Sequence, residues 1–259
     1  MAPKVENLSP DASADFADIW YDIAPDDHFW VWWRFKHLLW EIRAIDLDTA
    51  LPMRGLDIGC GHGAVQRQLA ANTRWIADGC DLNRLALEKN AGHPARVLYY
   101  DVHDRRPELR EYYDFLVMFD VLEHIPDAAS FVQSAAYHLK PGGFVFVNVP
   151  AMQSLYSKYD AIQGHCRRYD KPTLHEHLAA GPFTVHSMRY WGMLMVPIVL
   201  ARKLYVSRKT SAEDIMKRGF QPPGRASASM LSAVLGVEAR WLASPPLGTS
   251  LMAVARKPT

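Results

Sequence analysis

The segment LDIGCGHG, residues 56–63, carries the clearest information about the fold of this chain. It is the end of an apolar strand, followed by a turn with three alternating glycines and by the predicted helix AVQRQLAANT at residues 64–73. Glycine lacks a Cβ, so the turn can adopt positive φ and its amides can approach a ligand closely. The helix offers its positive N-terminal end to polar or anionic groups. In an open parallel α/β sheet, such a turn lies at the crevice where ligands bind.

Strand, turn and helix then alternate along the chain. Strands are predicted in WIADGCDLN, RVLYYDVHD, YYDFLVMFD and GFVFVNVP, and helices in RLALEKNAG and DAASFVQSAAYHLK. Strands separated by helices of this length indicate βαβ crossovers and a mostly parallel sheet. A sixth strand is predicted at residues 181–192 and a helical insertion at about 193–243. The last strand, at 247–258, has no long helix directly before it, so we expect it to pair antiparallel with the sixth.

The N-terminal part has a different composition. Residues 1–15 are polar and are predicted to be a loose lead-in, whereas residues 16–48 are rich in aromatic side chains. A Pro-Asp-Asp sequence at 25–27 is typical of a helix start. A helix from about 27 to 46 would place aromatic side chains on one stripe at i+3 and i+4 spacing. The stripe consists of Trp30, Trp33, His37 and Trp40.

The amino-acid composition argues against several classes of protein. The 259 residues include 29 Lys+Arg and 28 Asp+Glu, a net charge of +1, which removes the usual electrostatic reason to expect nucleic acid as the partner. Three cysteines without metal-finger spacing predict neither a disulfide framework nor a structural zinc site. We expect a cytoplasmic protein, because no secretory h-region and no run of about 20 apolar residues are present.

Acids follow the ends of successive predicted strands. The turn spacing is GxGxG, neither the dinucleotide GxGxxG nor a phosphate-binding loop ending in Gly-Lys-Ser/Thr. Asp81 lies about 20 residues beyond it, where an acid can accept hydrogen bonds from both hydroxyls of a ribose. Asp101 could accept from an exocyclic amine. Each could be a plain loop acid, but their shared position favours one extended nucleoside-like ligand.

These segments together resemble the class I S-adenosylmethionine-dependent methyltransferases. The matching segments are LDIGCGHG, CDLN, YYDVHD, FDVLEHIPD and LKPGGFVFVNVP, in that order, over about residues 54–150. The resemblance implies a Rossmann-like, doubly wound α/β fold with a seven-stranded, mostly parallel sheet and an antiparallel last strand. It implies S-adenosylmethionine as the methyl donor. We expect an aromatic lid segment at 1–48 and the cofactor-binding domain at 49–259.

The resemblance also implies which residues hold the cofactor. The glycines of the turn would line its methionine part, Asp81 its ribose, and Asp101 with Val102 its adenine. Phe119 and Asp120 would lie beside the sulfonium, and Arg34 could reach the cofactor carboxylate from the N-terminal helix. The full predicted set is Arg34, Asp57, Gly59, Cys60, Gly61, Gly63, Asp81, Leu82, Asp101, Val102, Phe119 and Asp120.

On the acceptor side, the first candidate segment is Asp120-Val-Leu-Glu123-His124. It resembles the metal-associated segment of ubiquinone-pathway O-methyltransferases, which would make Asp120, Glu123 and His124 ligands. The alternative, which we favour, is helix capping with a histidine packed under the cofactor and no metal. His124 is kept as a candidate catalytic residue.

The second candidate segment, residues 159–169, follows the fifth strand and overhangs the crevice. Its GHxRRY pattern, with the upstream HFWxxxR, resembles a bacterial subgroup of type 11/12-like methyltransferases. His165 could accept a proton from the acceptor, since histidine titrates near neutrality. Arg167 or Arg168 could bind an anionic group, or could pair with loop acids such as Asp160. The candidates are His165, His124 and Arg168 for catalysis, and Tyr21, Trp30, Trp33, Tyr159, Arg167 and Tyr169 for the acceptor.

The stretch at 191–205 is apolar and then basic, and too short to cross a bilayer. Four interpretations are open: a buried helix, a wall of the acceptor pocket, a dimer contact, or an interfacial helix at a membrane surface. The leading hypothesis is methyl transfer to an oxygen or nitrogen of a small aromatic or lipophilic molecule. The alternatives are a catalytically silent cofactor-binding partner or regulatory module and, disfavoured by the glycine spacing, an NAD-type oxidoreductase.

Overall fold

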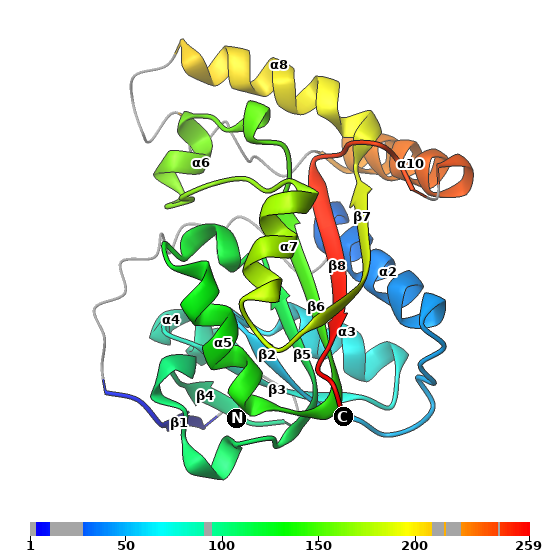
Figure 1. Cartoon of the computed structure of the whole chain (residues 1–259). Helices are drawn as coiled ribbons and strands as arrows, with labels where there is room; N and C mark the ends of the chain where they lie inside the picture. Colours follow the sequence, from blue (N-terminus) through cyan, green and yellow to red (C-terminus); the bar gives the residue numbers. More distant parts are fainter. Residues whose placement is uncertain (1–3, 11–27, 91–94, 209–214, 216–223, 243) are drawn as a thin grey trace.

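The structure of the chain, a computed structural model, describes residues 4–10, 28–90, 95–208, 215, 224–242 and 244–259 (Figure 1). Helices cover both faces of a central sheet. The strands are β1 (Val5–Asn7), β2 (Arg54–Ile58), β3 (Ile76–Asp81), β4 (Val97–Tyr99), β5 (Tyr113–Phe119), β6 (Leu139–Pro150), β7 (Thr184–Trp191) and β8 (Ser250–Arg256). The α-helices are α2 (Phe29–Ala44), α3 (Ala64–Asn72), α4 (Arg84–Lys89), α5 (Ala128–His138), α6 (Lys158–Ile162), α7 (Lys171–Ala179), α8 (Val196–Ser207) and α10 (Arg225–Trp241).

The sheet has the order β1-β4-β3-β2-β5-β6-β8-β7. Its first six strands pair parallel, and β8 pairs antiparallel with both β6 and β7. The predicted Rossmann-like sheet with an antiparallel last strand is therefore confirmed. The sheet has eight strands in place of seven, because Val5–Asn7 pair with Val97–Tyr99 at the edge. The prediction of a loose lead-in was wrong at these residues.

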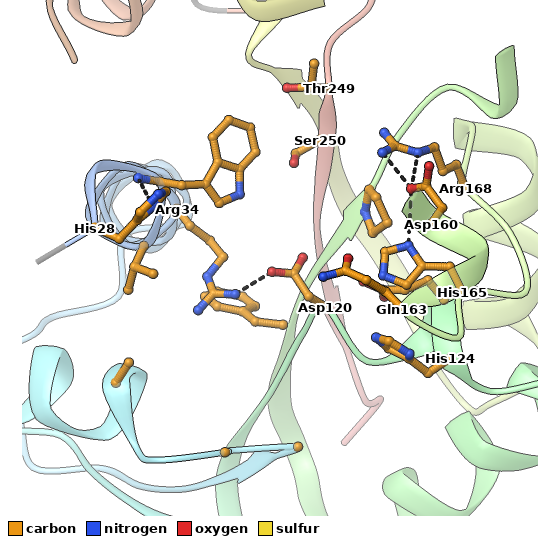
Figure 2. Close-up of a pocket in the computed structure, with 18 of the residues that line it drawn as sticks. His28, Arg34, Asp120, His124, Asp160, Gln163, His165, Arg168, Thr249 and Ser250 are labelled. Atoms are coloured by element: carbon orange, nitrogen blue, oxygen red, sulfur yellow. Dashed lines mark hydrogen bonds and ion pairs between the residues drawn. The ribbon is translucent and has the colours of Figure 1, made fainter. Parts of the chain in front are cut away.

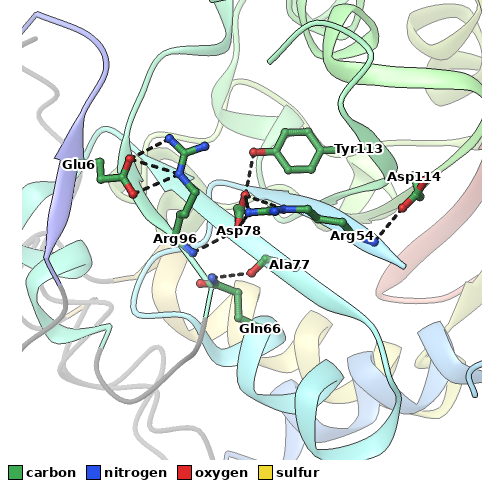
Figure 3. Close-up of polar contacts among 8 residues, drawn as sticks. All are labelled: Glu6, Arg54, Gln66, Ala77, Asp78, Arg96, Tyr113 and Asp114. Atoms are coloured by element: carbon green, nitrogen blue, oxygen red, sulfur yellow. Dashed lines mark hydrogen bonds and ion pairs between the residues drawn. The ribbon is translucent and has the colours of Figure 1, made fainter. Parts of the chain in front are cut away.

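A polar network that centres on the buried Asp78 reaches the edge strand β1 (Figure 3). Asp78 of β3 is fully buried and accepts hydrogen bonds from Arg54 Nη2 at 3.0 Å and Tyr113 Oη at 3.1 Å. Its Oδ1 also accepts from the backbone amide of Arg96 at 3.1 Å. The Arg96 guanidinium pairs with Glu6 of β1 at 2.8 Å. The network thus joins β1, β2, β3 and β5. No pattern in the sequence indicates that these side chains pair.

The two faces of the sheet bury separate apolar clusters. Leu56 and Ile58 of β2 belong to a cluster that α5 and α7 cover. Phe115 and Val117 of β5 belong to a second cluster, which includes side chains of α2, α3 and α10. Alternation along a strand places successive side chains on opposite faces, so a sheet covered on both sides reads as a continuous apolar run.

Helix α2 covers the second cluster. It begins at Phe29, where the Nδ1 of His28 accepts a hydrogen bond from the amide of Trp30 at 3.2 Å, and it ends at Ala44. The prediction placed these ends at about 27 and 46. The expected acidic start at 25–27 lies outside the described residues, and the first turn itself contains no acid.

The aromatic stripe of α2 is mainly core. Trp30 stacks on Trp191 of β7 with ring centroids 4.3 Å apart, and His37 stacks on the same indole at 4.7 Å. Burial lowers the pKa of His37 to about 3, so its ring is neutral at physiological pH. Trp33 is buried among core side chains of the second cluster. The stripe therefore fixes α2 on the sheet, and only Trp30 of its four members lines the cavity described next.

Candidate functional site

A cavity of about 420 Å³ lies at the carboxyl ends of the central parallel strands (Figure 2). Its walls come from the glycine turn, the first half of α2, the loop after β5, residues 159–168, the start of α8 and residues 249–250. Figure 1 shows α6, α8 and α10 gathered beyond these strand ends. The crossover topology thus brings segments more than a hundred residues apart to one cavity.

The glycine turn forms one wall. Gly59, Gly61 and Gly63 have φ of 72°, 53° and 83°, a region that favours residues without a Cβ. A Cβ at Gly59 would lie 2.5 Å from Val121, so this turn has room for backbone only. Gly59 and Gly61 line the cavity, whereas Gly63 begins α3 and packs against Asn90.

Asp57 and Arg34 also line the cavity, and each has a buried polar atom without a hydrogen-bond partner among the described residues. Asp57 is 2% exposed, and no group of the described residues hydrogen-bonds its Oδ2. Burial, opposed by the charge of Arg34 and assisted by that of Asp81, raises the pKa of Asp57 to about 7. The Nε of Arg34 likewise has no partner among the described residues. A buried acceptor and a buried donor without partners fit the ammonium and carboxylate of an amino acid, such as the methionine part of S-adenosylmethionine.

Asp81 and Asp101 lie at the neighbouring strand ends, outside the cavity lining. Asp81 accepts hydrogen bonds from the amides of Gly61 at 2.9 Å and Asn83 at 2.8 Å, so it ties the glycine turn to β3. Burial, opposed by these amides, raises its pKa. Asp101 accepts from the amide of His103 at 2.9 Å. Leu82 and Val102 accompany these acids and also lie outside the lining.

An ion pair stands at the end of β5. Arg34 of α2 donates to Asp120 Oδ2, and its guanidinium lies 5.1 Å from the ring centroid of Phe119. Asn148 of β6 donates to Asp120 Oδ1 at 2.8 Å and accepts from Trp191 Nε1 at 2.9 Å. Asp120 has φ of 56°, unusual for a residue with a Cβ. Four elements therefore position this carboxylate at the cavity.

His165 faces the cavity from the opposite side. Its Nδ1 lies 3.3 Å from Oδ1 of the fully buried Asp160. Arg168 Nε donates to the same carboxylate oxygen at 2.7 Å, and Ser157 donates to Oδ2 at 2.8 Å. Burial would raise the pKa of Asp160, but His165, Arg168 and Ser157 together hold it below its usual range. Figure 2 shows His165 between Asp160 and His124. Arg168 therefore holds the loop through Asp160, as one of the two interpretations predicted.

Glu123 and two histidines form a compact group. Ligand atoms of Glu123, His124 and His165 lie within 4.8 Å of one another, a donor set that could hold a cation. The resemblance to ubiquinone-pathway O-methyltransferases would make Asp120, Glu123 and His124 the metal ligands. Asp120 instead accepts hydrogen bonds from Arg34 and Asn148. Burial, then the charge of Asp120, raises the pKa of Glu123 well above its usual range. Burial, then His165, lowers the pKa of His124 to about 4.

Three predicted acceptor residues lie away from the cavity. Trp33 is in the core. Tyr169 is fully buried and donates its hydroxyl to the carbonyl of Leu122 at 3.1 Å. Arg167 donates to the carbonyl of Pro126 at 2.8 Å on the outer side of the loop. The backbone direction of this loop sends neighbouring side chains to different sides, so the cavity receives His165 and Arg168. Tyr21 lies outside the described residues.

The other predicted residues are in the lining. They are Arg34, Asp57, Gly59, Cys60, Gly61, Phe119, Asp120, His124, His165, Arg168, Trp30 and Tyr159. Sequence reasoning missed His28, Thr249 and Ser250. The α8 side chains Ile198, Val199 and Arg202 lie in the stretch 191–205, for which an acceptor wall was one of the interpretations. His28 stands in the HFW motif and could have been found there. Thr249 and Ser250 carry no pattern, because their position depends on the antiparallel return of β8.

A methyltransferase-domain family model matches residues 19–188, more than half of the chain. The chain belongs to this family. With the sheet order and the glycine turn, this confirms the class I S-adenosylmethionine-dependent methyltransferase that the sequence resembles.

Curated relatives point to the same class. The chain is 33% identical over 155 residues to a ubiquinone biosynthesis O-methyltransferase of Shewanella sp., covering 54% of this chain and 62% of that protein. The matching region thus spans less than two thirds of such relatives.

Solved structures share the fold at lower identity. An S-adenosylmethionine-dependent methyltransferase from Mesorhizobium loti superposes with a TM-score of 0.54 at 15% identity, covering 83% of this chain and 95% of that one. The [4+2]-cyclase SpnF superposes with 0.52 at 16% identity, covering 81% and 77%. Because these folds include a cyclase, fold similarity alone does not define the reaction.

Proposed function

We propose that this protein transfers a methyl group from S-adenosylmethionine to an oxygen or nitrogen of a small aromatic or lipophilic molecule. One observation carries the proposal: a single cavity joins the glycine turn on one side to His165 on the other. A donor site and a candidate proton acceptor in one enclosure are what an in-line transfer requires, because orientation supplies much of the rate.

The cofactor supplies an electrophilic methyl group on a positively charged sulfur. The residues proposed to hold it are those of the glycine turn, with Asp57 for the ammonium and Arg34 for the carboxylate. Asp81 and the backbone amides at the end of β3 are proposed to bind the ribose. Asp101 and Val102 are proposed to bind the adenine. Asp120 and Phe119 are proposed to lie beside the sulfonium.

On the acceptor side, His165 is proposed to accept the proton that a hydroxyl or amine loses as its bond to the methyl carbon forms and the carbon–sulfur bond breaks. Asp160 Oδ1 lies 3.3 Å from Nδ1 of this ring, and we infer that it favours the tautomer with the hydrogen on Nδ1 and the lone pair on Nε2. Tyr156 donates to the carbonyl of His165 at 2.7 Å and so steadies the loop.

The acceptor wall is largely apolar. Met195, Ile198 and Val199 line it from α8 and the turn before it, and Leu231 lines it from α10. Such a wall favours a lipophilic or aromatic body, since small-molecule sites are lined mainly by apolar side chains. The relatives' name as O-methyltransferases favours oxygen as the methylated atom.

The test compares wild type with His165→Ala and, as a matched control, the exposed His175→Ala of α7. Methyl-labelled donor and a panel of phenols and amines measure turnover, and titration calorimetry measures donor affinity. We expect His165→Ala to lower kcat by about 10²-fold or more with donor affinity kept, as for a lost general base, and His175→Ala to change neither. If wild type binds donor tightly but methylates nothing, the silent-module alternative replaces this proposal.

A further inference from the structure

The helices that cover the cavity carry an unusual share of exposed apolar side chains. Eight of the thirteen large exposed hydrophobic residues in the described part of the chain lie between residues 194 and 241. They are Leu194, Ile198, Leu200, Leu204, Tyr205, Met230, Val237 and Trp241. The rest of the described surface, although larger, provides only five. A concentration of this kind marks an interaction surface.

These side chains form a stripe on each helix. Leu194, just before α8, and Ile198 and Tyr205 in it recur at spacings of four and seven. Leu200 and Leu204, four residues apart, form a second exposed row on α8. On α10, Met230, Val237 and Trp241 recur at spacings of seven and four. Residues at these spacings share one helix face.

The other side of α10 accounts for the folding role of that helix. Leu235 is 2% exposed and belongs to the cluster that also contains Trp33. Glu238 is also buried, where it accepts hydrogen bonds from the amides of Gly192 at 2.6 Å and Leu194 at 2.8 Å. The inward face thus anchors α10, and the outward face, which is normally polar on a surface helix, is apolar.

On the described residues of these two helices, the exposed charged side chains are all basic. Helix α8 contains no acid, and the one acid of α10 is the buried Glu238. Arg208 at the end of α8 and Arg240 at the end of α10 are exposed, and Lys203 is half-buried. Apolar stripes with basic and no exposed acidic neighbours on these two helices complement an anionic lipid surface, whose headgroups attract lysine and arginine.

The stripes also adjoin the cavity. Ile198 is 47% exposed and at the same time lines the cavity, so it belongs to both surfaces. Val199 and Arg202, on the neighbouring side of α8, line the cavity as well. The described helices contain none that combines the length and the apolar composition needed to cross a bilayer. Contact through these stripes would therefore be with the membrane surface.

We propose that α8 and α10 dock this protein on an anionic membrane surface, with the cavity opening next to the lipid. A lipophilic acceptor dissolved in the bilayer could then reach the donor without crossing water. This last step rests on the proposed function, whereas the docking itself does not.

The test measures partition onto lipid vesicles by flotation, without donor or acceptor. Vesicles are of phosphatidylcholine alone or phosphatidylcholine with phosphatidylglycerol. The double variant Leu204→Glu/Trp241→Glu replaces side chains that are 58% and 75% exposed, and the matched control Leu51→Glu/Leu85→Glu replaces side chains that are 61% and 56% exposed on the sheet domain. None of the four lines the cavity.

We expect wild type to float with the anionic vesicles and less with the neutral ones. The α8/α10 variant should bind the anionic vesicles about tenfold or more weakly, because it loses two inserted apolar side chains and gains two negative charges. The control variant should bind like wild type. Circular dichroism and methylation of a water-soluble phenol report whether each variant is folded and active.

Three results would overturn the proposal: no binding of wild type to either vesicle, equal loss in both double variants, or a wild-type dimer by light scattering that Leu204→Glu/Trp241→Glu converts to a monomer. Loss of methyl transfer by wild type on every acceptor, with vesicle binding intact, would instead count against the proposed function alone.

Discussion

Replacing Asp57 by asparagine removes a buried charge while preserving shape. Asp57 is 2% exposed, and its pKa is about 7 against an ordinary 3.8. A tenfold difference in proton affinity corresponds to about 1.4 kcal/mol, so ionising this carboxyl in the ligand-free site costs about 4 kcal/mol more than in the unfolded chain. The charge of Arg34 offsets only part of this cost, and Oδ2 has no hydrogen-bond partner among the described residues.

The pH dependence follows from the direction of this shift. The folded state binds the proton of Asp57 more tightly than the unfolded chain, so the stability contribution is complete below about pH 4 and is lost as pH rises towards 7. The asparagine side chain would not titrate. As the pH rises from 5 to 8, the unfolding free energy of Asp57→Asn should increase by about 2–3 kcal/mol relative to that of wild type.

The assay is urea unfolding of the ligand-free protein, followed by the fluorescence of its eight tryptophans at several pH values. Asp48→Asn, at an exposed position, is the control, and it should run parallel to wild type. Affinity for S-adenosylhomocysteine should fall in Asp57→Asn by about 1.5–3 kcal/mol, the loss of a charged hydrogen-bond partner. Parallel pH curves for Asp57→Asn and wild type, together with equal affinity, would refute the reasoning.

Two further predictions concern the strand ends and the edge of the sheet. Asp81→Ala should weaken binding of S-adenosylhomocysteine by about 1–3 kcal/mol in titration calorimetry, and an unchanged dissociation constant would remove Asp81 from the site. Asp78→Ala leaves the buried Tyr113 hydroxyl and the partly exposed Arg54 without their acceptor, so unfolding free energy should fall by about 1–3 kcal/mol. Lys140→Ala, which removes the surface pair with Asp114 and keeps the hydrogen bond from the Arg54 amide to Asp114, should cost less than about 1 kcal/mol. Equal losses in the last two variants would show that the Asp78 network adds nothing to an ordinary surface pair.

Much of the site was predictable because it depends on strand ends. Gly59, Gly61 and Asp57 stand in one unbroken stretch, and a parallel sheet brings carboxyl ends of strands to one edge by topology alone. Phe119 and Asp120 follow from the same rule. The antiparallel pairing of the last strand with β7 was also predicted correctly, although two helices, α8 and α10, lie between these strands.

Residues whose roles depend on side-chain direction were not predictable. Arg167, Arg168 and Tyr169 are neighbours in the sequence, yet they face outward, toward Asp160 and into the core, respectively. Trp33 lies about one turn of α2 after Trp30 and packs in the core, whereas Trp30 lines the cavity. The third member of the Glu123–His124 group is His165, from a loop some forty positions away, and not the adjacent Asp120.

The sheet, its crossovers and the glycine turn can be read from the amino-acid order alone, because they follow from periodicity and from the backbone freedom of glycine, which are local properties. Three features emerge only in the folded molecule: Val5–Asn7 extend the sheet, Asp160 stands behind His165, and α8 and α10 turn apolar stripes outward. These depend on burial and on contacts between distant segments, and the free energy of such contacts is set by packing and is not encoded in any short stretch.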